Sequence, residues 1–263
     1  GMIHIRDLFE KLNNKKKVNC QLLIAADGKN SFIRKEAGIT VYKKNYNQKA
    51  FIFNVKHTKS HENLATENFL KYGPLASLPI IQNKSNCYSS IVWSCNHPFY
   101  YKIIKYNKKE LETKLNSYLS EYYGKLKIIT DIKSWDLSLV KANKFFDTRI
   151  LLIGDAAHSI HPLAGQGLNL TLKGIEIFYK LSKNKSLKEM DIGSDKILNA
   201  FSKKQYLNTI AIIFATDKLN FLFSNSNFFL KKAREIGLFA FKRSGFLKNI
   251  FKNYASEGKI SIK

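Results

Sequence analysis

Residues 149–169 combine residue types that can hold a polar ligand at the end of a buried strand. The run 150–153 is short and apolar, as expected of a strand that is covered on both faces. Asp155 follows this run, at the place where strands of α/β sheets present ligand-binding groups. Gly165 and Gly167 lack a Cβ, so the backbone can come close to a flat ligand. A helix that begins near Leu168 directs its free N–H groups to the same place.

A site of this kind has the chemistry that a flavin requires. A carboxylate accepts a hydrogen bond from a sugar hydroxyl, and the N–H groups of a helix terminus stabilise a ring that becomes anionic. The alternative for Asp155 is a cap of a helix or turn, because aspartate is a common capping residue.

A second stretch, earlier in the chain, has the same order of features. Residues 22–28 form an apolar run that ends in Asp27 and Gly28, and Ser31 is then expected to cap a helix. Together the two stretches resemble the Asp-Gly and Gly-Asp motifs of class A flavin monooxygenases, a family typified by aromatic ring hydroxylases. Further segments resemble the subfamily that hydroxylates ubiquinone precursors, namely 61–69, 73–79, 90–93 and 161–167.

This resemblance implies a cofactor, a reaction and a set of site residues. FAD is the implied cofactor, NAD(P)H is the co-substrate of an O2-dependent hydroxylation, and the substrate is an aromatic ring with a polyprenyl tail. The cofactor-binding residues that the motifs carry over are Asp27, Gly28, Arg34, Asp155, Pro162, Gly165, Gln166, Gly167, Leu168 and Asn169. No side chain is assigned a catalytic role and no metal is expected, because the chemistry resides in the cofactor.

Several of these residues also have a structural alternative. Pro162 is expected beside the reactive edge of the flavin, but prolines are common in ordinary turns. Asp27 and Arg34 are expected near the pyrophosphate or the nicotinamide route, and a salt bridge between structural elements is the alternative. For His158 and His161, a structural role is favoured over acid–base catalysis.

The sequence departs from the family in two ways. Members begin with a strand, a Gly-x-Gly-x-x-Gly turn and a helix that bind the ADP part of FAD, and no glycines here have that spacing. The residues before the Asp27 strand are also fewer than the ~30 that a βαβ unit needs. Thr171 and Gly174 replace a usual Gly and Asp, which removes a carboxylate that could hold the helix against the sheet.

We therefore expect a C-terminal fragment of a flavin hydroxylase that binds FAD weakly or not at all and is inactive alone. The first alternative is a non-catalytic or split-enzyme subunit that is completed by an N-terminal partner chain or by a second copy. The second alternative is a basic protein that binds membrane surfaces.

Composition and charge bound these hypotheses. No apolar run among the 263 residues reaches the ~18 residues that span a bilayer. Cys20, Cys87 and Cys95 are odd in number and lack metal-ligand spacing, which predicts reduced, buried thiols in a cytoplasmic protein. The net charge of +24 comes from scattered lysines without a nucleic-acid-binding motif, so no nucleic acid is expected as a partner.

The region 201–263 has phenylalanines at helical spacing among lysines and arginines. Such helices pack on the flavin domain or lie on an anionic membrane surface, and packing is favoured because aromatic stripes usually belong to a core. The expected location is cytoplasmic, with attachment to the periphery of the inner membrane as the alternative.

The expected fold class is α/β (α+β), with a partial Rossmann-like domain, an inserted antiparallel sheet and C-terminal helices. The predicted domains are a partial FAD-binding domain at 1–40, a substrate domain at 41–147, the FAD-binding domain continued at 148–182 and a helical region at 183–263. Strands are expected at 50–55, 66–70, 76–81, 88–94, 100–106 and 127–135. A helix is expected at 109–123, with Leu111, Leu115 and Leu119 on one face.

Overall fold

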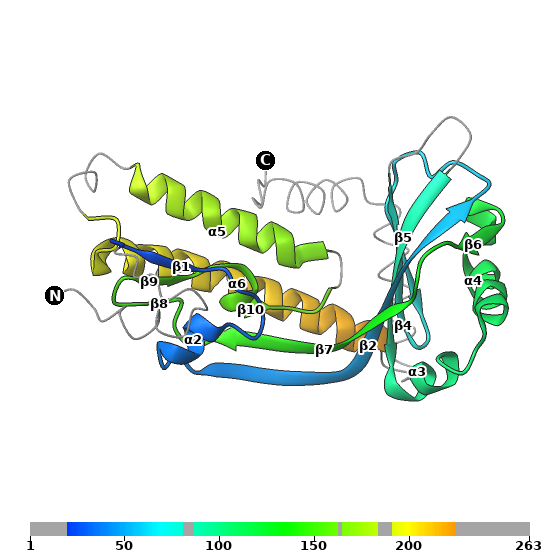
Figure 1. Cartoon of the computed structure of the whole chain (residues 1–263), viewed down its shortest axis with the longest axis horizontal. Coiled ribbons are helices and arrows are strands. Elements are labelled where there is room, and N and C mark those ends of the chain that lie inside the picture. Colours follow the sequence, from blue (N-terminus) through cyan, green and yellow to red (C-terminus); the bar gives the residue numbers. More distant parts are fainter. Residues whose placement is uncertain (1–19, 81–86, 163–164, 184–190, 225–263) are drawn as a thin grey trace, which may run out of the picture. The chain divides into compact units, whose positions relative to one another are not determined.

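The computed structural model describes residues 20–80, 87–162, 165–183 and 191–224. Its elements in chain order are β1 (Leu23–Ala25), α2 (Phe32–Glu36), β2 (Val41–His57), β3 (Thr66–Leu70), β4 (Gly73–Pro79), β5 (Cys87–Asn96), α3 (His97–Ile103), α4 (Lys108–Tyr123), β6 (Leu126–Ile128), β7 (Lys133–Ala142), β8 (Phe146–Asp147), β9 (Ile150–Leu152), the 3-10 helix η1 (Gly154–Ala156), β10 (His158–Ser159), α5 (Gln166–Ser182) and α6 (Asp195–Ser224) (Figure 1). They form two compact units. The described residues of unit 1 fall within 20–44 and 138–218, and the described residues of unit 2 fall within 45–137 and 219–224.

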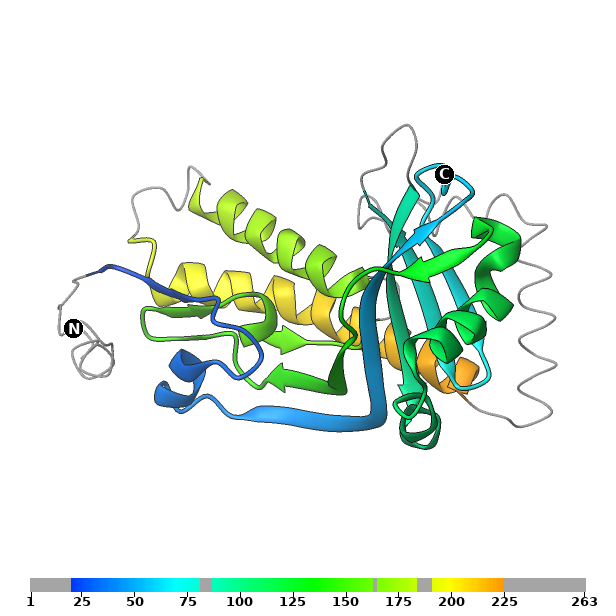
Figure 2. The same ribbon diagram turned by 45° about the vertical axis from the view of Figure 1, so that its right-hand side comes forward.

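Unit 1 is built on a small sheet in the order β1-β9-β8. β1 and β9 are parallel, with Leu23 opposite Ile150, and β8 is antiparallel to β9. Helices α5 and α6 run side by side next to this sheet in both views (Figures 1 and 2). Phe178 of α5 and Phe201 of α6 meet edge to face in a core that also holds the three residues of β9. The parallel pair therefore carries its two carboxyl ends to one edge of the sheet.

Unit 2 is an antiparallel sheet in which β2, β5, β4 and β3 are neighbours and β6 pairs with β2. Alternate residues of these strands, such as Phe53 and Trp93, are buried against α3 and α4. Leu111, Leu115 and Leu119 of α4 are buried in the same core, as the sequence pattern predicted. Asn107 and Glu110 form a capping box that fixes the start of α4.

The predicted α/β (α+β) class, with an antiparallel sheet and helices after it, is confirmed. The strand predicted at 100–106 is wrong, because residues 97–103 form helix α3. The Asn96 side chain accepts a hydrogen bond from Phe99 N–H, and Pro98 lies in the first turn, where no backbone donor is needed. The strand predicted at 127–135 is divided into β6 and the start of β7.

Two further expectations concern the cysteines and the membrane. Cys95 is buried, which raises the pKa of its thiol to about 12, but Cys20 is exposed, so the expectation of burial is wrong there. None of the helices in the described ranges is long and apolar enough to cross a bilayer. Most of the predicted helical region 183–263, including residues 225–263, lies outside the described residues.

Candidate flavin site

The two predicted motifs lie side by side because β1 and β9 are parallel neighbours. Ile153 N–H donates to Ala25 O over 2.9 Å at the carboxyl end of the pair. Asp27 and Gly28 follow β1 there, and Asp155 follows β9 within η1. The structure thus brings together two groups of predicted site residues that are far apart in the sequence.

Arg34 of α2 joins the two motifs. Its guanidinium is buried and donates to Ala156 O over 2.7 Å and to Lys29 O over 2.9 Å. Burial lowers the pKa of Arg34 and the charge of Asp27 opposes that shift, but an arginine stays charged at neutral pH. Arg34 therefore joins the two motifs through hydrogen bonds to backbone carbonyls, not through the salt bridge that was the structural alternative.

Asp27 is a helix cap in this structure. Its carboxylate accepts hydrogen bonds from Phe32 N–H at 2.8 Å and Ile33 N–H at 3.2 Å. Burial acts to raise the pKa of Asp27, but these bonds and one from the Ser31 side chain lower it overall. Ser31 in turn accepts from Arg34 N–H, as its predicted capping role requires. A contact of Asp27 or Gly28 with a cofactor stays a prediction.

Asp155 differs from Asp27 in having no such partner. No hydrogen bond joins its carboxylate to another residue in the described part of the chain, and it does not cap η1. Asp155 is exposed, but the surrounding protein still raises the pKa of its carboxyl by desolvation, and the positive charge of Lys29 opposes that shift. A carboxylate left without a backbone donor at a strand end can accept a hydrogen bond from a ligand hydroxyl.

The start of α5 supplies the second half of the site. Gly165, with a φ of +62°, precedes the helix, and no side chain caps the first turn. A Cβ added at Gly165 would have no atom within 4 Å, and one at Gly167 would meet only Ile160, at 3.8 Å. The N–H groups of the first turn have no acceptor within the helix. The backbone at these glycines can therefore be approached closely.

These two halves lie beside each other. A Cβ at Gly154 would be 3.4 Å from Thr171 Cγ2, so η1 packs against the second turn of α5. Pro162 is exposed, and its carbonyl accepts from Gly165 N–H at 3.2 Å in the turn that leads into the helix. Gln166 is half-buried, and Leu168 and Asn169 are exposed. The carboxylate, the glycines and the helix terminus fit the ribityl chain and the ring of a flavin.

Thr171 and Gly174, which stand where the family usually has Gly and Asp, each have a local structural explanation. Thr171 donates to Gly167 O at 3.0 Å within α5. Gly174 makes room for Gln205 of α6, whose amide nitrogen lies 3.1 Å from the position of an added Cβ. That nitrogen donates to Leu170 O at 3.1 Å and lies 3.2 Å from His158 Nε2. Gln205 of α6 thus makes polar contacts with Leu170 of α5 and His158 of β10.

His158 and His161 are both buried next to this site. Burial lowers the pKa of each imidazole to about 4, so both are neutral at pH 7. The His158 ring packs edge to face on Phe145. Both histidines therefore have the buried surroundings of structural residues.

The sequence interpretation missed Lys29, whose charge acts on Asp155, and Gln205. Gln205 lies on α6, a helix whose sequence also holds several aromatic residues. The available signal was a set of polar residues at helical spacing in an apolar segment, Gln205, Thr209, Thr216 and Asp217, of which the first three are buried.

Comparisons with known proteins agree with this geometry. Ubiquinone hydroxylase UbiL of Rhodospirillum rubrum is 31% identical over 244 residues, which cover 93% of this chain and 56% of that protein. The human mitochondrial ubiquinone biosynthesis monooxygenase COQ6 is 30% identical over 271 residues, which cover 90% and 57%. The chain thus spans little more than half the length of these relatives.

Solved structures support the fold. The flavin-dependent brominase Bmp2 superimposes with a TM-score of 0.68 at 14% identity, over 91% of this chain and 58% of the brominase. The family described as FAD binding domain matches residues 5–183, which include the Asp-Gly motif, the Gly-Asp motif and the whole of α5. The chain belongs to this family of FAD-binding domains.

Proposed function

We propose that this chain carries the flavin-facing groups and the substrate unit of an FAD-dependent monooxygenase. Its substrate is the aromatic ring of a polyprenylated ubiquinone precursor, and NAD(P)H is its co-substrate. Family membership supports FAD as the cofactor, and the names of the relatives support the substrate class. When bound, FAD supplies the oxygen-transfer chemistry, while the chain orients the ring and stabilises its negative charge.

One observation carries this proposal. Asp155 presents a carboxylate that accepts no hydrogen bond from the described part of the chain, next to the glycine-flanked N-terminus of α5, which no described side chain caps. The carboxylate would bind a ribityl hydroxyl, and the N–H groups of residues 165–169 would face the ring. Weak binding of FAD by this chain alone remains part of the proposal.

Titration with FAD tests the proposal, with flavin fluorescence and bound absorbance as readouts. We expect saturable binding in the micromolar range for the wild-type chain. Asp155→Asn should weaken it by roughly tenfold or more, because a hydrogen bond to a charged group contributes about 1.5–3 kcal/mol. Asp136→Asn is the matched control, since Asp136 is an exposed carboxylate of unit 2. Equal affinity of Asp155→Asn and wild type would contradict the site.

A second candidate function is that of a subunit completed by another polypeptide. The outer face of α5 exposes Leu168, Leu172, Ile175 and Tyr179 at helical spacing. Among the described residues β1 is the end strand of its sheet, and its Ile24 is 45% exposed. Parallel strands are usually covered on both faces, and an open edge next to apolar surface is a place where another chain packs.

Sedimentation at increasing protein concentration separates this candidate from a self-sufficient monomer. Self-association of the wild-type chain that the double variant Leu172→Gln/Ile175→Gln abolishes would support the covered face. A monomer at all concentrations would instead require a different partner chain, to be detected by recovery of FAD binding on its addition.

Peripheral attachment of a cytoplasmic protein to the inner membrane also belongs to this proposal. Leu207, Ile210 and Phe214 of α6 are exposed on one face, and exposed lysines such as Lys203 and Lys204 accompany them. Flotation with anionic lipid vesicles at moderate salt tests this point, because purely electrostatic adsorption is screened under that condition. Loss of flotation on Phe214→Gln would show that this face makes the contact.

A further inference from the structure

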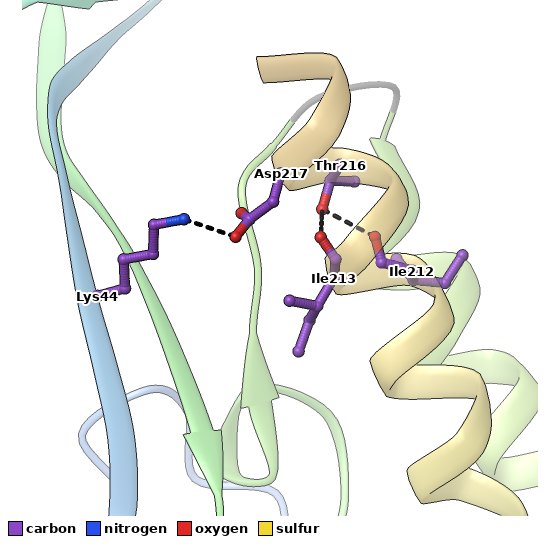
Figure 3. Close-up of polar contacts among 5 residues, drawn as sticks. All are labelled: Lys44, Ile212, Ile213, Thr216 and Asp217. Carbon is purple, nitrogen blue, oxygen red and sulfur yellow. Dashed lines mark hydrogen bonds and ion pairs between the residues drawn. The ribbon is translucent and has the colours of Figure 1, made fainter. Parts of the chain in front are cut away.

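Among the described residues of α6, Gln205, Thr209 and Thr216 have buried polar side chains. The hydroxyl of Thr209 donates to Gln205 O over 2.8 Å, within the helix. The hydroxyl of Thr216 also bonds within the helix, to Ile212 O over 2.9 Å and to Ile213 O over 3.1 Å (Figure 3). Gln205 differs from both threonines, because its side chain bonds two other elements of unit 1.

The amide nitrogen of Gln205 lies between α5 and β10. It donates to Leu170 O of α5 over 3.1 Å, and it lies 3.2 Å from Nε2 of His158 on β10. With the amide turned over, its oxygen would face the Leu170 carbonyl, and two acceptors would oppose each other. The nitrogen therefore faces both groups, and its two hydrogens serve one each.

This arrangement determines where the His158 ring carries its proton. A ring nitrogen that accepts from an amide N–H is itself unprotonated, so the neutral ring is protonated at Nδ1. Burial lowers the pKa of His158 to about 4, which keeps the ring neutral at pH 7. His158 is 1% exposed and Gln205 is 2% exposed, so bulk water does not compete for the bond between them.

The surroundings of Gln205 hold its amide in this place. A Cβ at Gly174 of α5 would lie 3.1 Å from the amide nitrogen, so α5 has no side chain where the amide lies. Helix α6 is held to unit 1 by other contacts as well. Ile197 belongs to the apolar core, and farther along the helix Asp217 accepts from Lys44 Nζ over 2.6 Å (Figure 3). Helix α6 is thus a firm support from which Gln205 reaches its two neighbours.

We propose that Gln205 is a positioning residue, whose amide nitrogen ties α5 to β10 and so sets the place of the first turn of α5 relative to Asp155. His158 comes shortly after Asp155, and Leu170 directly follows the segment 165–169, so each bond is made close to one half of the site. The consequence for FAD rests on the proposed function, but the two bonds of Gln205 do not.

Nitrogen NMR of the histidine rings, in the full chain without FAD, tests the bonds. We expect the wild-type ring of His158 to be protonated at Nδ1. Gln205→Glu replaces the donor nitrogen by an acceptor of nearly the same shape, so the proton should move to Nε2. Thr216→Val is the matched control, because the Thr216 hydroxyl bonds carbonyls of its own helix, and it should leave the His158 resonances unchanged.

A wild-type ring protonated at Nε2 would overturn the proposal, since that nitrogen could not accept from Gln205. An unchanged ring in Gln205→Glu would overturn it as well. If Gln205→Glu does not fold, Gln205→Met decides the question. It keeps most of the volume and removes the donor, so the Nε2 resonance should move as that nitrogen loses its hydrogen bond, and an unmoved resonance would refute the bond.

The effect on the site is measured separately, as the affinity for FAD. Gln205→Met should weaken binding by roughly tenfold, because a carboxylate and a helix terminus that are not held together bind one ligand less well. Ile197→Val removes a methylene group from the apolar core of the same helix. It should also lower the melting temperature, but it should leave the affinity of the folded chain unchanged.

A loss of affinity in Gln205→Met alone would support the positioning role. An equal loss in both variants would overturn that role, because it would follow from stability and not from the bonds of Gln205. Unchanged affinity in Gln205→Met would overturn it too. A wild-type chain that does not bind FAD would count against the proposed function, while the protonation of the His158 ring would still test the bonds.

Discussion

The two units keep their structure in different ways. Unit 2 pairs ten residues of β2 with β5 and covers one face of its sheet with α3 and α4, so that side chains such as Leu75, Ile91 and Trp93 are 0% exposed. Unit 1 has a sheet of two- and three-residue strands and leaves apolar residues of α5 in water. Its segments are joined by polar side chains, notably Arg34, Gln205 and Asp217. Both units therefore have an apolar core, and in unit 1 buried polar side chains also join segments that are far apart in the sequence.

The largest expected difference between the two units is in how much stability each loses at low pH. Unit 1 holds His158 and His161, whose folded pKa values of about 4 lie below the unfolded value of 6.5. The unfolded chain therefore binds more protons between these pH values, so stability is full above pH 6.5 and is lost as the pH falls toward 4. The loss should approach about 3 kcal/mol for each histidine.

Urea unfolding at pH 7 and pH 4.5, followed by NMR signals of each unit, measures this difference. Burial also lowers the pKa of His57 in unit 2, so that unit should weaken less rather than not at all. An equal loss in both units would contradict the stated imbalance.

Removal of an apolar side chain should instead cost more free energy of unfolding in unit 2 than on the exposed face of α5 in unit 1. Leu115→Ala in the core of unit 2 should lower the free energy of unfolding by about 2–5 kcal/mol, because it leaves a cavity. Leu172→Ala on the exposed face of α5 should change it by only about 0.5 kcal/mol. Chemical denaturation of both variants checks this; a large loss for Leu172→Ala would show that its face is covered in solution.

The next largest effect is expected from replacing Arg34, which joins the two motifs. Arg34→Met removes two charged hydrogen bonds to Ala156 O and Lys29 O, and the expected loss of stability is about 2 kcal/mol. Thermal unfolding of unit 1 measures it. Lys35→Met, at an exposed position of the same helix, is the control and should leave the melting temperature unchanged.

The smallest effect concerns Gly174. Gly174→Ala gains about 1 kcal/mol of helix propensity but brings a Cβ within 3.1 Å of the Gln205 amide, which two contacts hold in place. We expect a net loss below about 1 kcal/mol. The double variant Gly174→Ala/Gln205→Ala, assayed by the same denaturation, should not show the added cost of this contact if the account is correct.

The sequence predicted those parts of the fold whose signals are local. The ends of β1 and β9, the Ser31 cap and the buried face of α4 follow from short patterns of residue type. The tyrosines and isoleucines of residues 100–106 favour a strand, whereas Asn96 and Pro98 start helix α3 there. In the site, the pairing of Arg34 with Ala156 and of Lys44 with Asp217 depends on tertiary packing, which no local pattern encodes.

The bond from Arg34 to Ala156 spans 122 positions of the chain, and residues 45–137 of unit 2 lie between its ends. Closing so long a loop is entropically costly, and contacts of this kind form slowly. If residues 45–137 condense first, the two ends are brought nearer and the remaining search is shorter. We therefore expect the site around Asp155 to form late in folding, so that the rate at which the chain gains the ability to bind FAD depends on how fast the inserted sheet folds.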